Sequence, residues 1–573
     1  MKPWQIGNTT VRSGLRTRDA LVALDGSGLE GQIRKGDGDV RFRELLGKAG
    51  VVALKEDKTN SVGRKFRAAL VRLGFLYPDA PRGISQADIG SRDFITPSGH
   101  RFIQAQSVAA QQECFLRALV GLSFDVSTST YREGGDFSPL LHLLLVMQWL
   151  EVKTGDSRLS FFEFTLFVQT TCDMTQTSQV GDEIVKYRQG RVNAANKKKY
   201  DSGAIEQLRL QEQKPLAAST YLDYGDMNLR WLKATGLFSQ RGRGIGFSEH
   251  RRPLITQLQH FIQPESVTVN YWRRLTGGVA LPIDDLVLAK ENLVDLLGEA
   301  KFRDIPVSFE IPNIATASDA ATIRHDLEEA IATYDEIAFA KQQVDEWENI
   351  AKYLAAMKGG KVQLKDSDDE TVTIPSGEAP AYLEWAVWRA FLAINKLKNP
   401  PSKSRGFKVD RDFFPVGNAP GGTPDLVLEF DEFILVVEVT LSTSFRQEAT
   451  EGTSVRNHVF RVGQEYSTTT KKPVYGLFLA PTLDPNTLSQ FKLGTYLTDE
   501  DEFRIDVVPM TIGQFVDLFE TMFASQSVDN ILIHQLVTEC ISYRDTSQKV
   551  RQWQESITST VDRMLAHLAV KID

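Results

Sequence analysis

The chain has 573 residues, of which 42% are hydrophobic and 9% aromatic, so it has enough apolar side chains for roughly two to four folded domains. This composition excludes a disordered chain. The three cysteines, Cys114, Cys172 and Cys540, lie far apart, which argues against a disulfide framework or a zinc-binding motif and favours a reducing compartment.

The sequence also predicts that the protein has no membrane partner. The N-terminal stretch MKPWQIGNTTVRSGLR contains no apolar signal core. The longest apolar run, near residues 140–150, is too short to span a bilayer and is interrupted by His142 and Gln148. We therefore expect a soluble cytoplasmic protein.

The net charge of −8 is unevenly distributed along the chain. Residues 1–290 contain 39 Lys and Arg against 30 Asp and Glu, a net charge of +9. Residues 291–573 contain 27 Lys and Arg against 44 Asp and Glu, a net charge of −17. Such an asymmetry is a hint that the basic half contacts a polyanion such as nucleic acid.

The first 282 residues predict two small units that resemble winged helices. In the first unit, about residues 39–110, the stretches RFRELLGKAG and SVGRKFRAALVRLGFL have helical periodicity. Turn residues and a short hairpin follow, and the TPSG segment is expected to cap the next helix. The second unit, about residues 205–265, has a Gly- and Arg-rich hairpin, SQRGRGIGFSEHRR, between two helical stretches.

We interpret this N-terminal region as a DNA-recognition region, because two winged-helix-like units in a basic segment are typical of DNA-reading domains. A further basic stretch at residues 186–199 is either a solvated helix face or a phosphate-contacting surface. For every candidate arginine, base reading and phosphate contact remain open alternatives. The candidate DNA-binding residues are Arg12, Arg16, Arg64, Lys65, Arg67, Arg241 and Arg243.

Residues 283–375 predict a helical linker, because HDLEEAIATYDEIAFAKQQVDEWENIAKYLAAM is a long amphipathic stretch. A polar, turn-rich segment, GGKVQLKDSDDETVTIPSGEAP, marks the next boundary. Residues 376–573 then alternate between helical and strand patterns, with strands expected at GFKVDRDFFPV, PDLVLEF and EFILVVEVT. The order predicts a C-terminal α/β domain with a mixed sheet flanked by helices.

Two acidic residues in this domain occupy positions that are costly for a carboxylate. Asp425 begins one predicted strand, and Glu438 lies within the apolar run ILVVEV of the next. If the chain turns at residues 431–432, the two acids lie side by side on antiparallel strands. A metal ion, with the carbonyl of Val439 as a third oxygen ligand, would compensate them. A core salt bridge from Glu438 to Arg446 or Arg456 is the alternative.

Three further residues are candidates for the same site. Glu384 lies among apolar and aromatic residues in LEWAVWRAF, so it is either paired or directed into a site. Glu451 and His458 are seven residues apart, two helical turns along one face. His458 is expected to act as a general base or to position the attacking water. Taken singly, each residue is more often structural, and a Glu and a His at this spacing are usually just exposed.

The segments KPWQIGNTTVR, LEWAVWRAF, GGTPDLVLEFDEFILVVEVT and RNHVFRVGQEY resemble the AlwI family of Type IIS restriction endonucleases and related strand-specific nicking enzymes. The acidic strand pair resembles the metal-binding core of PD-(D/E)xK nucleases. The resemblance implies that Asp425 and Glu438 bind metal, and that Glu384, Glu451 and His458 complete the active site. The general nuclease pattern has Lys two residues after the second acid, whereas Thr440 stands here, and the AlwI-like group also lacks that Lys. The cation at the transition state is then expected from His458 or from a second metal ion.

The resemblance implies a Type IIS enzyme that binds a short asymmetric site in double-stranded DNA and cuts at a fixed distance outside it, with Mg²⁺ as the favoured metal. It also implies a companion DNA methyltransferase, a bacterial or archaeal source, and a transient homodimer or a small second subunit for double-strand cleavage. The alternatives are a strand-specific nicking subunit of a heterodimeric enzyme, a DNA-binding regulator with an inactive nuclease fold, and a nuclease that reads DNA shape.

Overall fold

The computed structural model describes residues 3–52, 61–125, 132–211, 215–241, 244–358, 363–365, 371–374, 378–443, 447, 451–498 and 501–571. The chain divides into two compact units, Met1–Ala332 and Thr333–Asp573, which are described separately. The boundary falls within the helix α15 (Ala317–Gln342), so the predicted linker 283–375 is shared between the two units. Within the described residues, no helix combines the length and the apolar character needed to cross a membrane.

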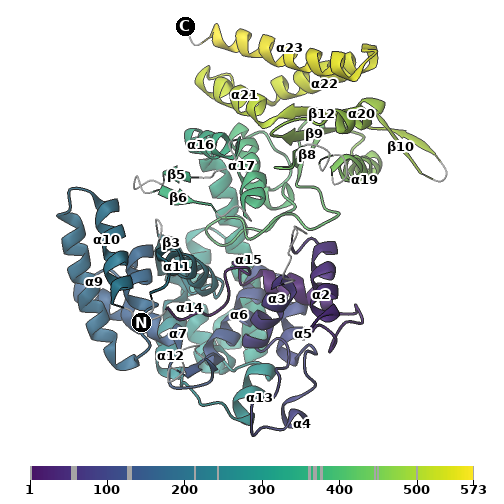
Figure 1. Cartoon of the computed structure of the whole chain (residues 1–573). Coiled ribbons are helices and arrows are strands. Elements are labelled where there is room, and N and C mark those ends of the chain that lie inside the picture. Colours follow the sequence, from purple (N-terminus) through teal and green to yellow (C-terminus); the bar gives the residue numbers. More distant parts are fainter. Residues whose placement is uncertain are drawn as a thin grey trace. The chain divides into compact units, whose positions relative to one another are not determined.

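The first unit consists mainly of helices (Figure 1). Its helices are α1 (Arg16–Leu24), α2 (Asp37–Lys48), α3 (Ser61–Arg72), α4 (Gln86–Ile89), α5 (Pro97–Gln104), α6 (Val108–Gly121), α7 (Pro139–Thr154), α8 (Phe161–Glu163), α9 (Thr177–Val192), α10 (Lys197–Leu210), α11 (Ala218–Lys233), α12 (Arg252–Phe261), α13 (Val269–Gly277), α14 (Leu286–Phe302) and the first part of α15. Its strands form two short hairpins, β1 (Phe124–Asp125) with β2 (Arg132–Glu133) and β3 (Phe238–Arg241) with β4 (Gly244–Phe247).

The two winged-helix-like predictions have different outcomes at the level of strands. The second hairpin is present as β3–β4, which lies between α11 and α12 as expected. In the first region, the described residues between α3 and α5 form only a single antiparallel bridge, Leu76 to Ile95, in place of the expected hairpin. The predicted cap is present, since the Thr96 side chain accepts a hydrogen bond from the Gly99 N–H at the start of α5.

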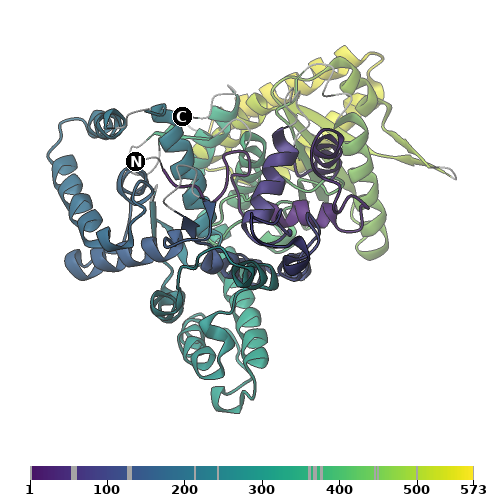
Figure 2. The same ribbon diagram turned by 60° about the horizontal axis from the view of Figure 1, so that its bottom comes forward.

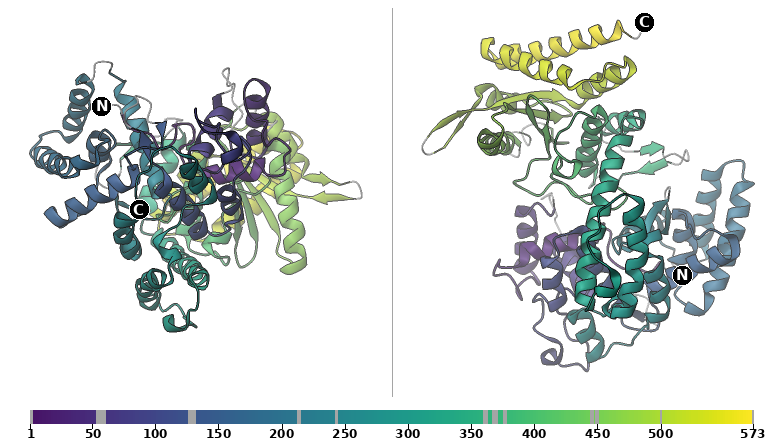
Figure 3. Two further views of the ribbon diagram at one scale, coloured as in Figure 1. Left: turned by 90° about the horizontal axis from the view of Figure 1, so that it is seen from below. Right: turned by 180° about the vertical axis from the view of Figure 1, so that it is seen from behind.

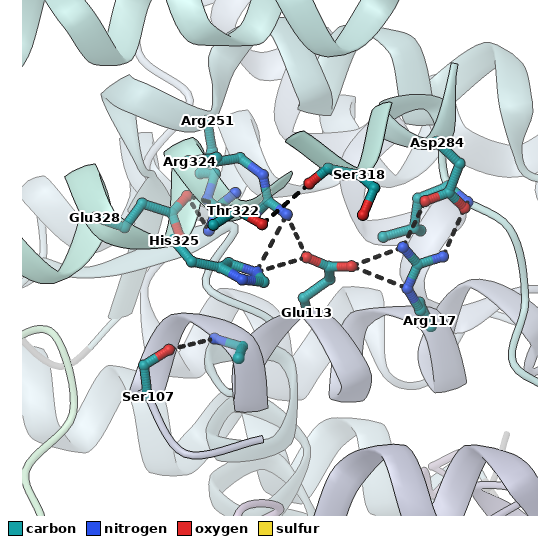
Figure 4. A network of polar contacts seen from close by, with 12 residues as sticks. Ser107, Glu113, Arg117, Arg251, Asp284, Ser318, Thr322, Arg324, His325 and Glu328 are labelled. Carbon is teal, nitrogen blue, oxygen red and sulfur yellow. Dashed lines mark hydrogen bonds and ion pairs between the residues drawn. The ribbon is translucent and has the colours of Figure 1, made fainter. Parts of the chain in front are cut away.

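A buried polar network joins α6 to α15 inside the first unit (Figure 4). The Glu113 carboxylate accepts hydrogen bonds from Arg117 at 2.6 Å and from Arg324, and it lies 2.9 Å from His325 Nε2. Arg117 also binds Asp284, at 2.6 Å and 2.7 Å. This network therefore ties the last helix of the unit to its core. Figure 2 shows α14 beside the first part of α15, and the two share a hydrophobic cluster.

The second unit contains a sheet covered by helices (Figure 3). Its helices, besides the end of α15, are α16 (Trp347–Lys358), α17 (Ala379–Ile394), α19 (Thr453–Thr469), α20 (Pro485–Leu493), α21 (Ile512–Ala524), α22 (Asn530–Thr546) and α23 (Val550–Ala569). Its strands are β5 (Gln363–Lys365), β6 (Thr371–Thr373), β7 (Leu426–Glu429), β8 (Ile434–Val439), β9 (Val474–Ala480), β10 (Thr495–Leu497), β11 (Glu502–Arg504) and β12 (Asp506–Thr511).

The main sheet has the strand order β12-β9-β8-β7, in which β7 is antiparallel to β8 and the other pairs are parallel. This confirms the predicted mixed sheet. The prediction of a strand at GFKVDRDFFPV was wrong, because this segment forms a loop. The Asp410 side chain there accepts hydrogen bonds from the backbone N–H groups of Asp412 and Phe414, which turns the chain back. The Trp385 indole holds this loop through the carbonyl of Phe413, at 2.6 Å.

A small residue in the sheet lets α19 approach closely. Gly476 on β9 pairs with Val436 on β8, and a Cβ at Gly476 would lie 2.8 Å from a methyl group of Val459 on α19. Because side chains alternate along a strand, Val436 and Glu438 face the same side. The helix α19 therefore packs on the sheet face that carries Glu438.

Candidate active site

The two strand acids lie opposite each other on the sheet. The β7–β8 register pairs Leu426 with Val437, so Asp425, one residue earlier, is opposite Glu438, one residue later. Directly opposed residues of an antiparallel pair project from the same face. The side-by-side arrangement predicted from the sequence is therefore present, on the face covered by α19.

Each strand acid has a defined hydrogen-bond partner. Asp425 Oδ2 accepts from the backbone N–H of Val439 at 2.8 Å, which ties β7 to the end of β8. Glu438 is 6% exposed, and its Oε1 lies 2.7 Å from Nδ1 of His458 on α19. His458 is 4% exposed, which excludes the alternative of an exposed histidine. The helix α19 thus places the imidazole of His458 in hydrogen-bond contact with Glu438.

The helix α17 contributes the third acid. Glu384 is 4% exposed, and its Oε2 accepts a hydrogen bond from the Ala419 N–H at 2.8 Å. Ala419 belongs to the loop 417–424 that leads into β7. The sequence left open whether Glu384 is paired or directed into the site. In the structure it is bound to a backbone N–H and lies near Asp425.

Thr440 connects the strand to the fourth acid, a contact that the sequence did not predict. Its hydroxyl donates to Glu451 Oε1 at 3.0 Å and accepts from the Ser442 N–H at 3.0 Å. Glu451 precedes the first residue of α19. The only sequence signal was that Thr440 stands where the general nuclease pattern has Lys.

Burial and mutual repulsion raise the pKa of three of these carboxyl groups. Burial is the main cause for Glu384, Asp425 and Glu438, whose pKa values are all raised well above the ordinary range. The neighbouring charges add to this: Asp425 acts on Glu384, Glu438 acts on Asp425, and Glu451 acts on all three. The four acids therefore form one electrostatic cluster that favours protons or cations.

The pKa of His458 is shifted in the opposite direction, below its ordinary value. Burial lowers its pKa, and the nearby charge of Arg461 lowers it further. A buried neutral imidazole beside a carboxyl group can share one proton with it or can accept a proton from water. The pair therefore combines a proton acceptor with an oxygen ligand.

The core salt bridge proposed as the alternative for Glu438 is not formed with Arg456. The Arg456 guanidinium donates instead to the backbone carbonyl of Thr495. Arg446 lies outside the described residues. Among the described residues, the side chain that pairs with the Glu438 carboxylate is His458.

The oxygen-rich donor set suits a hard divalent cation, because Asp425 and Glu438 offer carboxylate oxygens from one sheet face and repel each other without a positive charge. In the part of the chain that the structure describes, no three His, Cys, Asp or Glu side chains are close enough together to enclose a metal ion. A cation here would therefore need oxygen atoms besides those of the acids, such as the carbonyl of Val439, water or substrate.

Two of the candidate DNA-binding arginines take part in ion pairs within the first unit. Arg12 binds Asp226 at 2.9 Å. Arg67 contacts Asp39 at 3.4 Å. Their charges are thus partly neutralised inside the unit.

The other candidates differ in accessibility. Arg16 donates to a backbone carbonyl, and Lys65 binds a threonine hydroxyl at 2.9 Å. Arg64 is exposed on α3. The side chain of Arg241 and the whole of Arg243 lie outside what the structure describes. Among the candidates whose side chains the structure describes, Arg64 is therefore the best placed to meet a partner. DNA binding by all seven residues stays a prediction.

Comparisons with known proteins give two positive findings. The chain is similar to the small subunit of the heterodimeric restriction endonuclease R.BspD6I, with 23% identity, a TM-score of 0.28, and coverage of 37% of this chain and 97% of that one. No curated protein sequence matches it significantly. The sequence pattern of the AlwI restriction endonucleases matches residues 71–518, which is most of the chain and includes Glu384, Asp425, Glu438 and Glu451. The chain therefore belongs to the AlwI restriction endonuclease family, whose members act on DNA.

Proposed function

We propose that this protein is a metal-dependent Type IIS endonuclease with a nuclease domain of the PD-(D/E)xK type. The observation that carries the proposal is the cluster of Glu384, Asp425, Glu438 and Glu451, in which burial and repulsion raise the pKa of the first three. Such a cluster lowers the stability of the folded protein, so its presence favours a functional role. Cation binding for phosphodiester hydrolysis is the function that fits the family.

Asp425 and Glu438 would hold Mg²⁺, with the Val439 carbonyl as a further oxygen ligand. When bound, the ion would neutralise charge on the scissile phosphate and lower the pKa of an attacking water. Glu384 and Glu451 would add negative charge that increases the affinity of the site for cations. Thr440 would keep the Glu451 carboxylate in place through its hydrogen bond.

His458 has a role that follows from its contact with Glu438. The carboxylate can only accept a hydrogen bond when ionised, so the Nδ1 of His458 then carries the proton and Nε2 is the free acceptor. Nε2 is buried without a hydrogen-bond partner among the described residues. We propose that Nε2 accepts a proton from, or orients, the attacking water.

The proposed division of labour places sequence recognition in residues 1–282, spacing in residues 283–375 and cleavage in residues 376–573. The enzyme would read a short asymmetric site in double-stranded DNA. One chain supplies one acid cluster, so a monomer would cut one strand. Double-strand cleavage would then need a transient homodimer or a small second subunit, and a companion methyltransferase would protect the host DNA.

The proposal is tested with supercoiled plasmid, Mg²⁺ and the wild-type protein beside Asp425→Asn, followed by run-off sequencing of the ends. We expect discrete cuts at a constant offset from one motif, and a loss on the order of 1000-fold in D425N, since a metal ligand contributes several kcal/mol. Open circles at low protein concentration that become linear at high concentration would support nicking followed by pairing. An intact plasmid with retained DNA binding would instead mean a binding protein.

A further inference from the structure

The proposed active site contains an unusual balance of charge. Four carboxylates surround it, whereas position 440, where the general pattern has Lys, carries a threonine. The substrate is itself a polyanion, and its scissile phosphate gains negative charge in the transition state. A positively charged side chain beside the acids would stabilise this charge, as would a second metal ion.

Arg461 lies where such a side chain would act. It is on α19, three residues after His458, so the two side chains project from the same face of the helix. Its positive charge also lowers the pKa of His458, in keeping with this position on the helix. His458 is buried but Arg461 is exposed, so the arginine lies at the outer edge of the site.

The hydrogen bonding of Arg461 leaves it available to a ligand. Among the described residues, the guanidinium makes one hydrogen bond, from Nη1 to the backbone carbonyl of Gly422 at 3.2 Å. An arginine has five N–H donors, so most of them face solvent. The other described arginine of α19, Arg456, donates instead to the backbone carbonyl of Thr495.

The loop that Arg461 contacts also borders the acids. Residues 417–424 bind Glu384 through the Ala419 N–H and Arg461 through the Gly422 carbonyl. Gly421 and Gly422 are exposed, and a Cβ at either would meet nothing within 4 Å. The outer side of this loop is thus open to solvent beside the arginine.

We propose that Arg461 binds a non-bridging oxygen of the DNA phosphate at the nuclease site and supplies the positive charge that Thr440 does not. This inference rests on the proposed nuclease function. A guanidinium binds phosphate through two parallel N–H groups, which fixes the orientation of the phosphate as well as its charge. Arg461 is then a catalytic residue, because it touches the substrate.

The test compares Arg461→Gln, Arg461→Lys and wild type in single-turnover cleavage of plasmid at saturating protein with Mg²⁺. Arg461→Gln keeps an amide donor for the Gly422 carbonyl but removes the charge. We expect R461Q to lower the cleavage rate roughly 10- to 100-fold and R461K to restore part of it. DNA binding, measured by gel shift with Ca²⁺ in place of Mg²⁺, should change by less than about threefold, because many other contacts hold the DNA.

Arg551→Gln is the matched control, since Arg551 is an 88% exposed arginine of the same unit whose ion pair is with Glu555 on its own helix. It should cut at the wild-type rate, and the melting temperatures of all variants should agree. If R461Q cuts as fast as wild type while D425N is inactive, Arg461 has no role in cleavage and the inference fails alone. If the wild type itself does not cut, the proposed function and this inference fail together.

Discussion

Glu384 illustrates at the residue scale how a functional acid affects stability. The side chain is 4% exposed, and burial together with the charge of Asp425 raises its pKa well above the ordinary value near 4.5. The folded protein therefore holds a proton that the unfolded chain releases above about pH 4.5. The contribution of Glu384 to stability is therefore fully present below about pH 4.5 and is lost as the pH rises through the pKa of Glu384 in the folded protein.

We therefore expect Glu384→Gln to stabilise the metal-free protein at alkaline pH. The gain should be about 1.4 kcal/mol for each pKa unit by which the folded value exceeds the unfolded one, since Gln cannot ionise. Thermal melting in EDTA at pH 5 and pH 8.5 measures it, and the difference between variant and wild type should be larger at pH 8.5. The same variant should cut DNA more slowly.

Glu502→Gln is the matched control for this experiment, because Glu502 is exposed on β11 of the same unit. It should leave the melting temperature unchanged at both values of pH. A Glu384→Gln protein that melts at or below the wild-type temperature at pH 8.5 would show that ionisation of Glu384 does not destabilise the folded protein.

At the scale of helices and strands, the apolar patterns of the second unit were sufficient to predict the site's framework. The spacing of apolar residues predicted α17, β7, β8 and α19, and the turn at residues 431–432 predicted the antiparallel pair. These elements carry their signal locally, in side-chain alternation and periodicity. The facing arrangement of Asp425 and Glu438 followed from them.

Other features depend on contacts between distant residues and could not be predicted. The loop 406–416 has strand-like composition, but an aspartate side chain and α17 hold it in a turn. The bond from His458 to Glu438 depends on α19 packing at Gly476, which no local pattern reveals. The family resemblance identified both residues, but it did not identify their partners.

The network that joins α6 to α15 gives a prediction at this scale. Although burial alone would raise the pKa of Glu113, the hydrogen bond from His325 and the charges of Arg324 and Arg117 hold it well below its ordinary value. Glu113→Gln should therefore destabilise the first unit by about 3 kcal/mol at pH 7, because it removes the negative charge that Arg117 and Arg324 share in this buried network. Urea unfolding measures this difference.

The pH dependence of the difference in unfolding free energy between wild type and E113Q shows whether the lost charge or altered packing causes the destabilisation. The pKa of Glu113 is lower in the folded protein than in the unfolded chain, where it is near 4.5. The ionised Glu113 therefore stabilises the fold at pH values above 4.5, and this stabilisation is lost as the pH falls toward the folded pKa. The wild type and E113Q should therefore become more alike below about pH 4.5. A difference that stays constant down to pH 3 would point to altered packing instead.

At the scale of the whole molecule, the two units differ in charge and in chemistry. Residues 1–332 carry 42 Lys and Arg against 39 Asp and Glu, a net of +3, and residues 333–573 carry 24 against 35, a net of −11. The asymmetry is therefore smaller at the structural boundary than at residue 290. The five catalytic residues predicted from the sequence and Arg461 belong to the second unit, whereas all seven residues predicted from the sequence to bind DNA belong to the first.

This separation predicts that the second unit can cut DNA without choosing a site. A fragment of residues 332–573 keeps its own hydrophobic core and the ion pair of Glu336 with Arg405, and it omits the part of α15 that packs in the first unit. With Mg²⁺ and plasmid, we expect slow cleavage that gives a smear, because the recognition residues are absent. The same fragment with Asp425→Asn should leave the plasmid intact.

The full chain, run beside the fragment, should give discrete bands from the same plasmid. If the fragment cuts at the same discrete sites, recognition belongs to the second unit and the assignment of residues 1–282 to recognition is wrong. If the fragment is folded by circular dichroism but inactive at every concentration, the first unit contributes to catalysis as well as to recognition. A smear that depends on Asp425 locates the chemistry in one unit and the choice of site in the other.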